Sequence, residues 1–534
     1  FMTRSGVVQS VHAFGEDSEL AMMFGVFMAI ILIVCFGLVI YRLPLLRARH
    51  ELDSWASREA AFLLNNWILL FSAVFILFAT MFPTLSEAIT GERLTVGPPF
   101  FNKWMLPIGL MLLLLTGVGP LLAWRKSTLS NLGNQFLWPI TAAVVTGGVL
   151  YALGFRVWAS GVCFMLCAFV LGTIGQEFIR GTRVRRDATG ADVLTSVTGL
   201  VARSHRRYGG YIIHVGIVLM FLGFAGEGYK LEEQVLLAPG QQVEVGAFVV
   251  RHEGVSVRDD GQKQMVTGSL QVFEEGEEIG MMYPARWFFR KHEQEPTTEV
   301  AIHRSISEDL YIVMAAFDMQ DQSASFQVTV NPLVNWIWFG FGIMALGTVI
   351  ALLPEQAFSF AASKIPMGAA TTSLLLFVLV ASAPLHAQHI ESAQTVPTVP
   401  RSAAERELYH EIVCMCGTCG RKLVGECTCG TAAMMRDEIS LLIDQGKTKE
   451  DVFQHFITMY GSQEPLAMPL DQGFNRLAWL FPYLLGLSGV VGVGTVALRW
   501  SMREATDAPL PAGILNDGDA QLIARLDDEL RDLD

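Results

Sequence analysis

Five of the eight cysteines in this 534-residue chain lie within sixteen consecutive positions: Cys414, Cys416, Cys419, Cys427 and Cys429. Cys416 and Cys419 form a C-x-x-C pair, a spacing that lets two thiols close a readily exchanged disulfide. Four of the five sulfurs would also suffice for a tetrahedral metal site. Purely structural disulfides are the third interpretation, although an odd number leaves one thiol over. The pattern favours thiol–disulfide exchange at Cys416 and Cys419, with Cys414, Cys427 and Cys429 as alternative metal ligands.

Two of the eleven histidines have informative surroundings. His12 lies just outside the first apolar run of the chain, and His214 lies within a later run. Ionisable side chains inside a bilayer are costly and usually functional, and an imidazole can bind haem iron axially. The alternative for His214 is a hydrogen bond between helices. Gly209 and Gly210 come shortly before it and would let a flat macrocycle or a neighbouring helix approach.

The other cysteines and one further histidine have simpler interpretations. Cys35, Cys163 and Cys167 lie inside apolar runs, where we expect them to be packing residues. His410 precedes Cys414 by four residues and could assist as a base or a ligand, but the favoured interpretation is an ordinary surface histidine. The chain has no C-x-x-C-H haem-attachment motif and no P-loop.

The composition indicates a membrane protein. Hydrophobic residues make up 52% of the chain and charged residues only 17%, whereas ordinary globular domains carry about 25% charged residues. The mean hydropathy of +0.41 agrees. The formal net charge of -13 disfavours nucleic-acid binding. The first residue is Phe1, so we expect that a preceding part is missing from this sequence.

Nine apolar runs approach or reach the length of about 20 residues that a membrane span needs. They cover residues 20–42, 61–82, 105–123, 136–154, 158–176, 210–227, 333–353, 369–385 and 475–498. Basic residues gather at 42–58, 125–126, 178–209 and 499–503, which predicts that these stretches face the cytoplasm. Every crossing then alternates, and the outer side receives residues 1–19, 84–104, 228–332 and 386–474.

Two outer segments are long enough to fold. Residues 228–332 carry 17 acidic and 8 basic residues, and short alternating stretches such as 242–245 are separated by turn signals at 259–261 and 274–276. This pattern predicts a small antiparallel β domain, whose acidity keeps the surface soluble or offers a docking face to a basic partner. Residues 386–474 are helical and cysteine-rich, with one helix over 434–443 and another opened by Thr448.

The run at 369–385 resembles a secretory signal with a small-residue cleavage site, which suggests that two ancestral genes were joined here. The predicted fold is mainly α, a polytopic helical membrane protein with a small extracytoplasmic β domain and a small extracytoplasmic helical, cysteine-rich domain. The predicted divisions are membrane helices with an external histidine loop at 1–227, the β domain at 228–332, a span at 333–353, a junction at 354–388, the cysteine-rich domain at 389–474, an anchor at 475–498 and an acidic tail at 499–534.

Several strings occur in the following order: Thr3-Arg4-Ser5-Gly6-Val7, Ser10-Val11-His12-Ala13-Phe14, Val96-Gly97-Pro98-Pro99-Phe100-Phe101-Asn102, Arg206-Arg207-Tyr208-Gly209-Gly210 followed by His214, and Asn331-Pro332-Leu333-Val334 followed by Trp336-Ile337-Trp338. Over about residues 1–355 they resemble CcmF, the cytochrome c haem lyase subunit. About residues 400–500 look like CcmH, a membrane-anchored thiol oxidoreductase of the same pathway. That likeness uses Glu411-Ile412, the C-x-x-C pair, Asp437-Glu438-Ile439, Gly446-Lys447 and Tyr460-Gly461.

This resemblance implies haem attachment to the C-x-x-C-H motif of apocytochrome c, with haem delivered by the chaperone CcmE. It implies that His12 is an axial ligand of the transient substrate haem and that His214 binds a stable transmembrane haem b. It also implies that Cys416 and Cys419 keep the substrate thiols reduced. The family's tryptophan-rich WWD segment and the partner haem ligands would precede Phe1, so we expect that this chain alone holds neither haem properly. The three additional cysteines depart from the single pair that is common in CcmH.

The implied location is the bacterial inner membrane, crossed several times, with periplasmic domains. The implied partners are CcmE, apocytochrome c, other cytochrome c maturation subunits and membrane lipid, with no nucleic acid. Two rival hypotheses are a haem transporter and a non-catalytic assembly scaffold of the maturation complex.

Overall fold

Long helices dominate the computed structural model, which describes residues 18–46, 54, 56–123, 129–290, 296–353, 402–416, 421–427 and 429–502. Its eight long helices in the described part are α1 (Ser18–Leu46), α2 (Arg58–Thr90), α3 (Pro98–Leu121), α4 (Leu129–Ala152), α5 (Trp158–Thr189), α7 (His205–Ala225), α8 (Asn335–Leu352) and α14 (Arg476–Met502). The first seven are long and apolar enough to cross a membrane. The eight helices coincide with eight of the nine predicted runs, and the run at 369–385 lies outside the described residues. The chain is therefore a multi-pass membrane protein.

The basic segment at 178–209, which is predicted to face the cytoplasm, is mostly helical. Helix α5 continues well past the apolar run and ends where Gly190 adopts the left-handed conformation (φ 67°). A short helix, α6 (Val193–Arg203), follows, with Asp192 as its N-cap. Arginine is a good helix former whose long side chain can reach water, so the helix continues beyond its apolar part until a glycine ends it.

Helices α7 and α8 pack closely along a row of glycines. Gly209 and Gly216 on α7 lie seven residues apart, as do Gly340 and Gly347 on α8. A Cβ on Gly216 would meet the Gly340 carbonyl oxygen at 2.6 Å, and one on Gly347 would meet the Gly209 carbonyl oxygen at 2.9 Å. Small residues let membrane helices approach in this way. Gly209, which precedes His214 on α7, therefore allows the close approach of helix α8.

We expect Gly216→Ala to weaken this packing. The added methyl group must push α7 and α8 apart, and such overpacking costs about 1–3 kcal/mol. Gly210→Ala is the matched control on the same helix, because a Cβ there meets nothing within 4 Å. Thermal unfolding in detergent should show a lower midpoint for Gly216→Ala and an unchanged or higher one for Gly210→Ala. Equal midpoints would mean that the glycines do not set the helix contact.

Between α7 and α8 the chain leaves the helices through the short 3₁₀ helix η1 (Gly226–Tyr229) and forms a β-sandwich. The strands are β1 (Leu231–Leu237), β2 (Gln242–Val245), β3 (Phe248–Asp259), β4 (Lys263–Glu274), β5 (Glu277–Met282), β6 (Ala285–Phe289), β7 (Thr297–Glu299), β8 (Ala301–Arg304), β9 (Glu308–Phe317) and β10 (Ala324–Pro332). One sheet has the order β1-β10-β9-β8. The other has β2-β3-β4-β6-β7, with β5 also paired to β4. All the pairings are antiparallel, as predicted.

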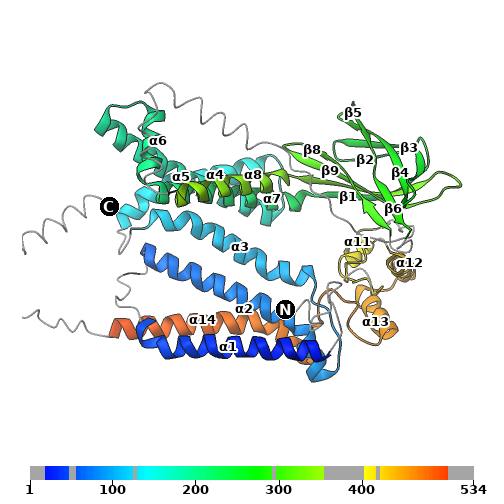
Figure 1. The fold of residues 1–534 in the computed structure, drawn as a ribbon, viewed down its shortest axis with the longest axis horizontal. Helices are drawn as coiled ribbons and strands as arrows, with labels where there is room; N and C mark the ends of the chain where they lie inside the picture. Colours follow the sequence, from blue (N-terminus) through cyan, green and yellow to red (C-terminus); the bar gives the residue numbers. More distant parts are fainter. Residues whose placement is uncertain are drawn as a thin grey trace, which may run out of the picture.

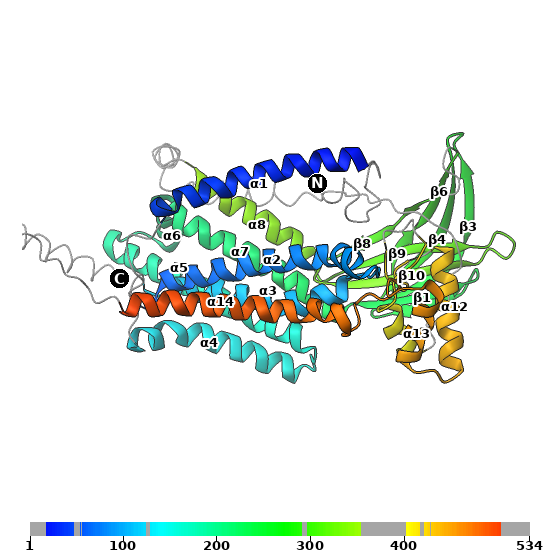
Figure 2. The same ribbon diagram turned by 90° about the horizontal axis from the view of Figure 1, so that it is seen from below.

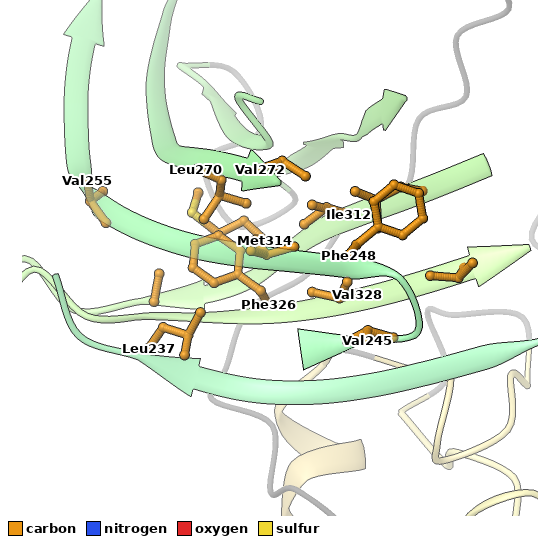
Figure 3. Close-up of a cluster of buried hydrophobic side chains, with 14 of the residues drawn as sticks. Leu237, Val245, Phe248, Val255, Leu270, Val272, Ile312, Met314, Phe326 and Val328 are labelled. Carbon is orange, nitrogen blue, oxygen red and sulfur yellow. The ribbon is translucent and has the colours of Figure 1, made fainter. Parts of the chain in front are cut away.

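Alternation along the strands explains the core of the sandwich. Phe248 and Val250 on β3 are fully buried, as are Phe326 and Val328 on β10, so both sheets turn alternate residues inward (Figure 3). The predicted turn at 274–276 joins β4 to β5, where Gly276 has φ 89°. The predicted turn at 259–261 joins β3 to β4 in the same way.

The cysteine-rich domain consists of three helices and their loops, within residues 402–475. The helices are α11 (Ala403–Tyr409), α12 (Gly430–Asp444) and α13 (Lys449–Tyr460), and the 3₁₀ helix η2 (Gly473–Asn475) leads into α14. Thr448 caps α13 in a capping box with Asp451, which confirms the predicted start of this helix. Helix α12 contains the predicted 434–443 segment.

The two domains outside the helix bundle share one end of it. In both views the sandwich and helices α11–α13 lie at the same end of the long helices, and α6 lies at the opposite end (Figures 1 and 2). This arrangement agrees with the predicted topology, in which 228–332 and 386–474 are on one side of the membrane and 178–209 is on the other.

Candidate functional site

The structure gathers four of the five clustered cysteines. The Sγ atoms of Cys414, Cys416, Cys427 and Cys429 all lie within 4.8 Å of one another. Cys416 is partly exposed and the other three are buried. Cys429 Sγ lies 3.3 Å from Cys414 Sγ and 3.5 Å from Cys427 Sγ, well beyond the covalent S–S length of about 2.05 Å. Cys419, the second cysteine of the C-x-x-C pair, lies outside the described residues.

We call Cys414, Cys416, Cys427 and Cys429 the thiol cluster. Backbone hydrogen bonds position the first half of this cluster. The Cys414 N–H donates to the Lys422 carbonyl at 2.8 Å, and the Val424 N–H donates to the Ile412 carbonyl at 2.8 Å. These two bonds pair residues 412–414 with residues 422–424, which lie on either side of the C-x-x-C motif in the sequence. The backbone therefore helps to place Cys414.

The start of α12 positions the other half. Cys429 is the N-cap of this helix, and its Sγ accepts from the Ala432 N–H at 3.4 Å. The positive end of the helix dipole favours a thiolate at such a position. The Cys427 carbonyl oxygen faces a further donor, Arg436, which comes from the second turn of the same helix.

Arg436 is the residue that the sequence interpretation missed. Its side chain is fully buried, and its Nη1 donates to the carbonyl oxygens of Val424 at 2.6 Å and Cys427 at 2.7 Å. Burial lowers the pKa of the guanidinium, and Tyr409 and the cluster sulfurs oppose that change. A signal was available: Arg436 shares the buried face of α12 with Ala432 and Ile439, where an apolar residue is expected.

The membrane histidine lies far along the chain from this cluster. His214 is half-buried on α7, and its buried Nδ1 has no hydrogen-bond partner among the described residues. Spacing places it on the same helix face as Tyr211 and Val218, which are buried in the core around α3, α5 and α7. The expected alternative of a hydrogen bond between helices is thus not seen at this nitrogen. An orphaned imidazole nitrogen in an apolar setting fits a ligand of haem iron.

A polar network lies one turn from His214. Glu177 on α5 is buried, and its Oε2 accepts from Arg207 Nη2 at 2.6 Å and from the Tyr211 hydroxyl at 3.3 Å. Arg207 Nε also donates to the Tyr211 hydroxyl at 3.2 Å. This ion pair joins α5 to the first turns of α7 and fixes the helix that carries His214.

The structure gives different outcomes for the other candidate residues from the sequence. His12 lies outside the described residues. His410 is exposed at the end of α11, as expected for a surface histidine. Cys163 and Cys167 are buried and their thiols donate to carbonyl oxygens of α7, which confirms the packing interpretation. Cys35 is exposed on α1, so the expectation of packing within the chain is wrong for this residue.

The loop between α2 and α3 connects the membrane helices to the cysteine-rich domain. Arg421 pairs with Glu464 and donates to the Thr95 hydroxyl at 2.9 Å. The Gly97 N–H donates to the Ala467 carbonyl at 2.8 Å. Arg421, which follows the C-x-x-C motif in the sequence, therefore contacts the membrane part.

Aromatic packing continues this contact into the membrane. Phe78 of α2 stacks on Phe481 of α14 with ring centroids 3.6 Å apart, and Phe100 of α3 meets Trp479 edge-on at 5.0 Å. Their core also contains Phe75, Phe82 and other residues of α2, α3 and α14. Segments nearly 400 residues apart in sequence thus form one packed unit.

These features define a multi-pass membrane protein with a β-sandwich and a thiol-bearing helical domain at one end of its helices. Two family profiles match it: "CcmF C-terminal beta-sandwich" at residues 228–332 and the CcmH family, "Cytochrome C biogenesis protein", at residues 374–526. The chain therefore carries, in one polypeptide, a sandwich that matches the C-terminal part of CcmF and a segment that matches CcmH.

Known relatives agree with this assignment. The chain is 31% identical over 360 residues to the cytochrome c-type biogenesis protein CcmF of Pseudomonas aeruginosa, covering 67% of this chain and 53% of that protein. It is 25% identical to CcmF of Escherichia coli over the same shares of both chains. The chain thus spans about half the length of the curated relatives it matches. A solved structure of "Cytochrome c Heme Lyase CcmF" is 26% identical, with a TM-score of 0.47, and covers 56% of this chain and 46% of that one.

Proposed function

We propose that this protein takes part in cytochrome c maturation by attaching haem covalently to apocytochrome c. The observation that supports this most is the joining of a CcmF sandwich and a CcmH thiol cluster at the same end of one helix bundle. Attachment requires haem and reduced substrate thiols to meet on the same side of the membrane. In the reaction, each cysteine S–H of the substrate adds across one haem vinyl group, so a C–S bond and a C–H bond form and no group leaves.

His214 is proposed to bind a haem b within the membrane and His12 to bind the substrate haem outside it. The buried, unpartnered Nδ1 of His214 supports the first assignment. A bound haem would supply an iron centre whose potential depends on its axial ligands. The Arg207–Glu177 pair holds α7 in place, so that the imidazole is presented from a rigid helix.

Cys416 and Cys419 are proposed to keep the substrate competent by thiol–disulfide exchange. A disulfide in the C-x-x-C-H motif of apocytochrome c would be reduced to two thiols while Cys416 and Cys419 become a disulfide. A thiol reductant from outside the chain must then return them to thiols. The partly exposed position of Cys416 supports this role, because the other described cluster thiols are buried.

The proposed setting is the bacterial inner membrane, with the sandwich and the cysteine-rich domain in the periplasm. There the protein would receive haem from CcmE and act with apocytochrome c and other maturation subunits. The gathering of basic residues at the opposite end of the bundle, on α5 and α6, supports this orientation by the positive-inside rule.

Substituting the exchange pair tests the thiol part of this proposal. Cells that depend on this protein should make at least tenfold less covalent cytochrome c with Cys416→Ser and Cys419→Ser, and added thiol reductant should restore it. Cys35→Ser, a thiol on α1 outside the cluster, is the control and should mature cytochrome c normally. Haem staining of denaturing gels measures the product. Normal maturation by the double variant without reductant would favour the scaffold hypothesis.

A further inference from the structure

We propose that Cys414, Cys416, Cys427 and Cys429 form a tetrathiolate binding site for Zn²⁺. The site goes beyond the proposed haem attachment and does not depend on it. It is carried by the arrangement of the four sulfurs, by the way the backbone places them and by the buried cation beside them.

The sulfur positions fit one ion. With Zn–S bonds of about 2.3 Å, the sulfurs of a tetrahedral site lie about 3.8 Å apart. All four Sγ atoms here lie within 4.8 Å of one another, and two of the separations are 3.3 and 3.5 Å. Two disulfides would instead divide the sulfurs into two close pairs. Cys429 is near both Cys414 and Cys427, which is the pattern of a shared centre.

The ligands form two C-x-C pairs, and each pair belongs to a different structural segment. Cys414 and Cys416 belong to the segment that the Cys414–Lys422 backbone bond folds back. Cys427 and Cys429 lead into α12, whose first N–H groups point toward Cys429. Structural zinc sites are typically closed by four protein ligands in this way. A small domain with a limited core also gains much from such a metal staple.

Arg436 supplies the positive charge that a buried anionic metal site needs beside it. Four thiolates and one Zn²⁺ carry a net charge of about −2, which is costly to bury without a cation nearby. The guanidinium of Arg436 is fully buried, contacts the Cys427 carbonyl, and interacts electrostatically with Cys414, Cys427 and Cys429. An arginine buried among apolar residues is otherwise unexpected, and a neighbouring anionic metal centre explains it.

Zinc binding has a consequence for the exchange pair. While the ion is bound, the Cys416 thiolate is committed to it, so exchange at the C-x-x-C motif requires the metal-free form. Metal occupancy would then decide whether the domain is a rigid structural unit or an active dithiol.

The test is the metal content of the whole protein, purified from native membranes without chelators and measured by elemental mass spectrometry. We expect about one Zn²⁺ per chain. Cys416→Ser should lower the content by tenfold or more, and Cys416→His should retain it, because an imidazole can replace a thiolate at this partly exposed position. Cys419→Ser and Cys35→Ser should keep the ion, because neither removes one of the four ligands.

Replacing Zn²⁺ with Co²⁺ gives a second readout that needs no variant. The visible absorption of a tetrahedral cobalt tetrathiolate should appear at one equivalent and disappear when Zn²⁺ is added back. A well-folded protein that holds no zinc after loading, or one whose zinc is lost in Cys419→Ser but kept in Cys416→Ser, would overturn the assignment. A protein that holds no zinc but still attaches haem would contradict the metal site and not the proposed function. A protein that holds zinc but attaches no haem would contradict the proposed function and not the metal site.

Discussion

Replacing His214 with glycine should remove the b-type haem absorbance from the protein purified from its native membranes. The reason is that the imidazole is the only group proposed to bind the iron from α7, and glycine leaves nothing to replace it. We expect the haem content, measured by pyridine haemochrome and by the reduced-minus-oxidised spectrum, to fall at least tenfold. Protein folding should be little affected, because Nδ1 of His214 has no hydrogen-bond partner among the described residues to lose.

Two controls make this result specific. His410→Gly removes an exposed histidine from the cysteine-rich domain and should keep the full haem content. Free imidazole added to His214→Gly should restore part of the absorbance, because a small ligand can enter the space that the side chain vacates. Unchanged haem in His214→Gly would remove His214 from the haem site and return it to the class of ordinary packing residues.

Replacing Arg436 with methionine should destabilise the cysteine-rich domain by about 2–4 kcal/mol. Methionine fills much of the same volume, but the buried carbonyl oxygens of Val424 and Cys427 lose their donor, and each unsatisfied buried acceptor costs about 1–3 kcal/mol. The matched control is Arg406→Met. Arg406 is exposed and its pairing with Glu233 at 3.9 Å contributes little.

Pulsed alkylation of the buried cysteines measures this effect. Cys414, Cys427 and Cys429 react only when the domain opens, so in chelator their labelling rate reports the open population. A cost of about 2–4 kcal/mol corresponds to a rise of more than tenfold in Arg436→Met. Labelling at the same rate as in Arg406→Met would show that the two Arg436 hydrogen bonds do not stabilise the segment that contains Val424 and Cys427.

The sequence predicted the elements of this fold well because each is determined locally. Eight of the nine apolar runs are helices in the described part of the chain, and the alternating stretches are strands whose turn signals fall where the strands connect. Thr448 opened α13 as the capping pattern predicted. That the basic segment at 178–209 is mostly helical was not predicted, because hydropathy finds the part of a helix in lipid and not the part of α5 that continues beyond it.

Contacts between distant segments were not predictable in the same way. Nothing near Thr95 indicates that it meets Arg421, 326 residues later, because that contact depends on how α14 packs against α2 and α3. The five cysteines were visible as a cluster, but three interpretations stayed open. Only the fold shows that Cys416 lies with Cys414, Cys427 and Cys429 around a common centre. Arg436 could have been noticed as a charge on an apolar helix face, but its two carbonyl partners could not.

The most direct test of the account is whether this protein forms covalent c-type haem. Bacterial cells whose only CcmF and CcmH functions come from this protein, expressed from its native gene, would express an apocytochrome c with one C-x-x-C-H motif. We expect haem that stays with the cytochrome polypeptide on a denaturing gel, and at least tenfold less of it with His214→Gly. Haem that crosses the membrane but never becomes covalently attached would contradict the proposed haem attachment and favour a transporter.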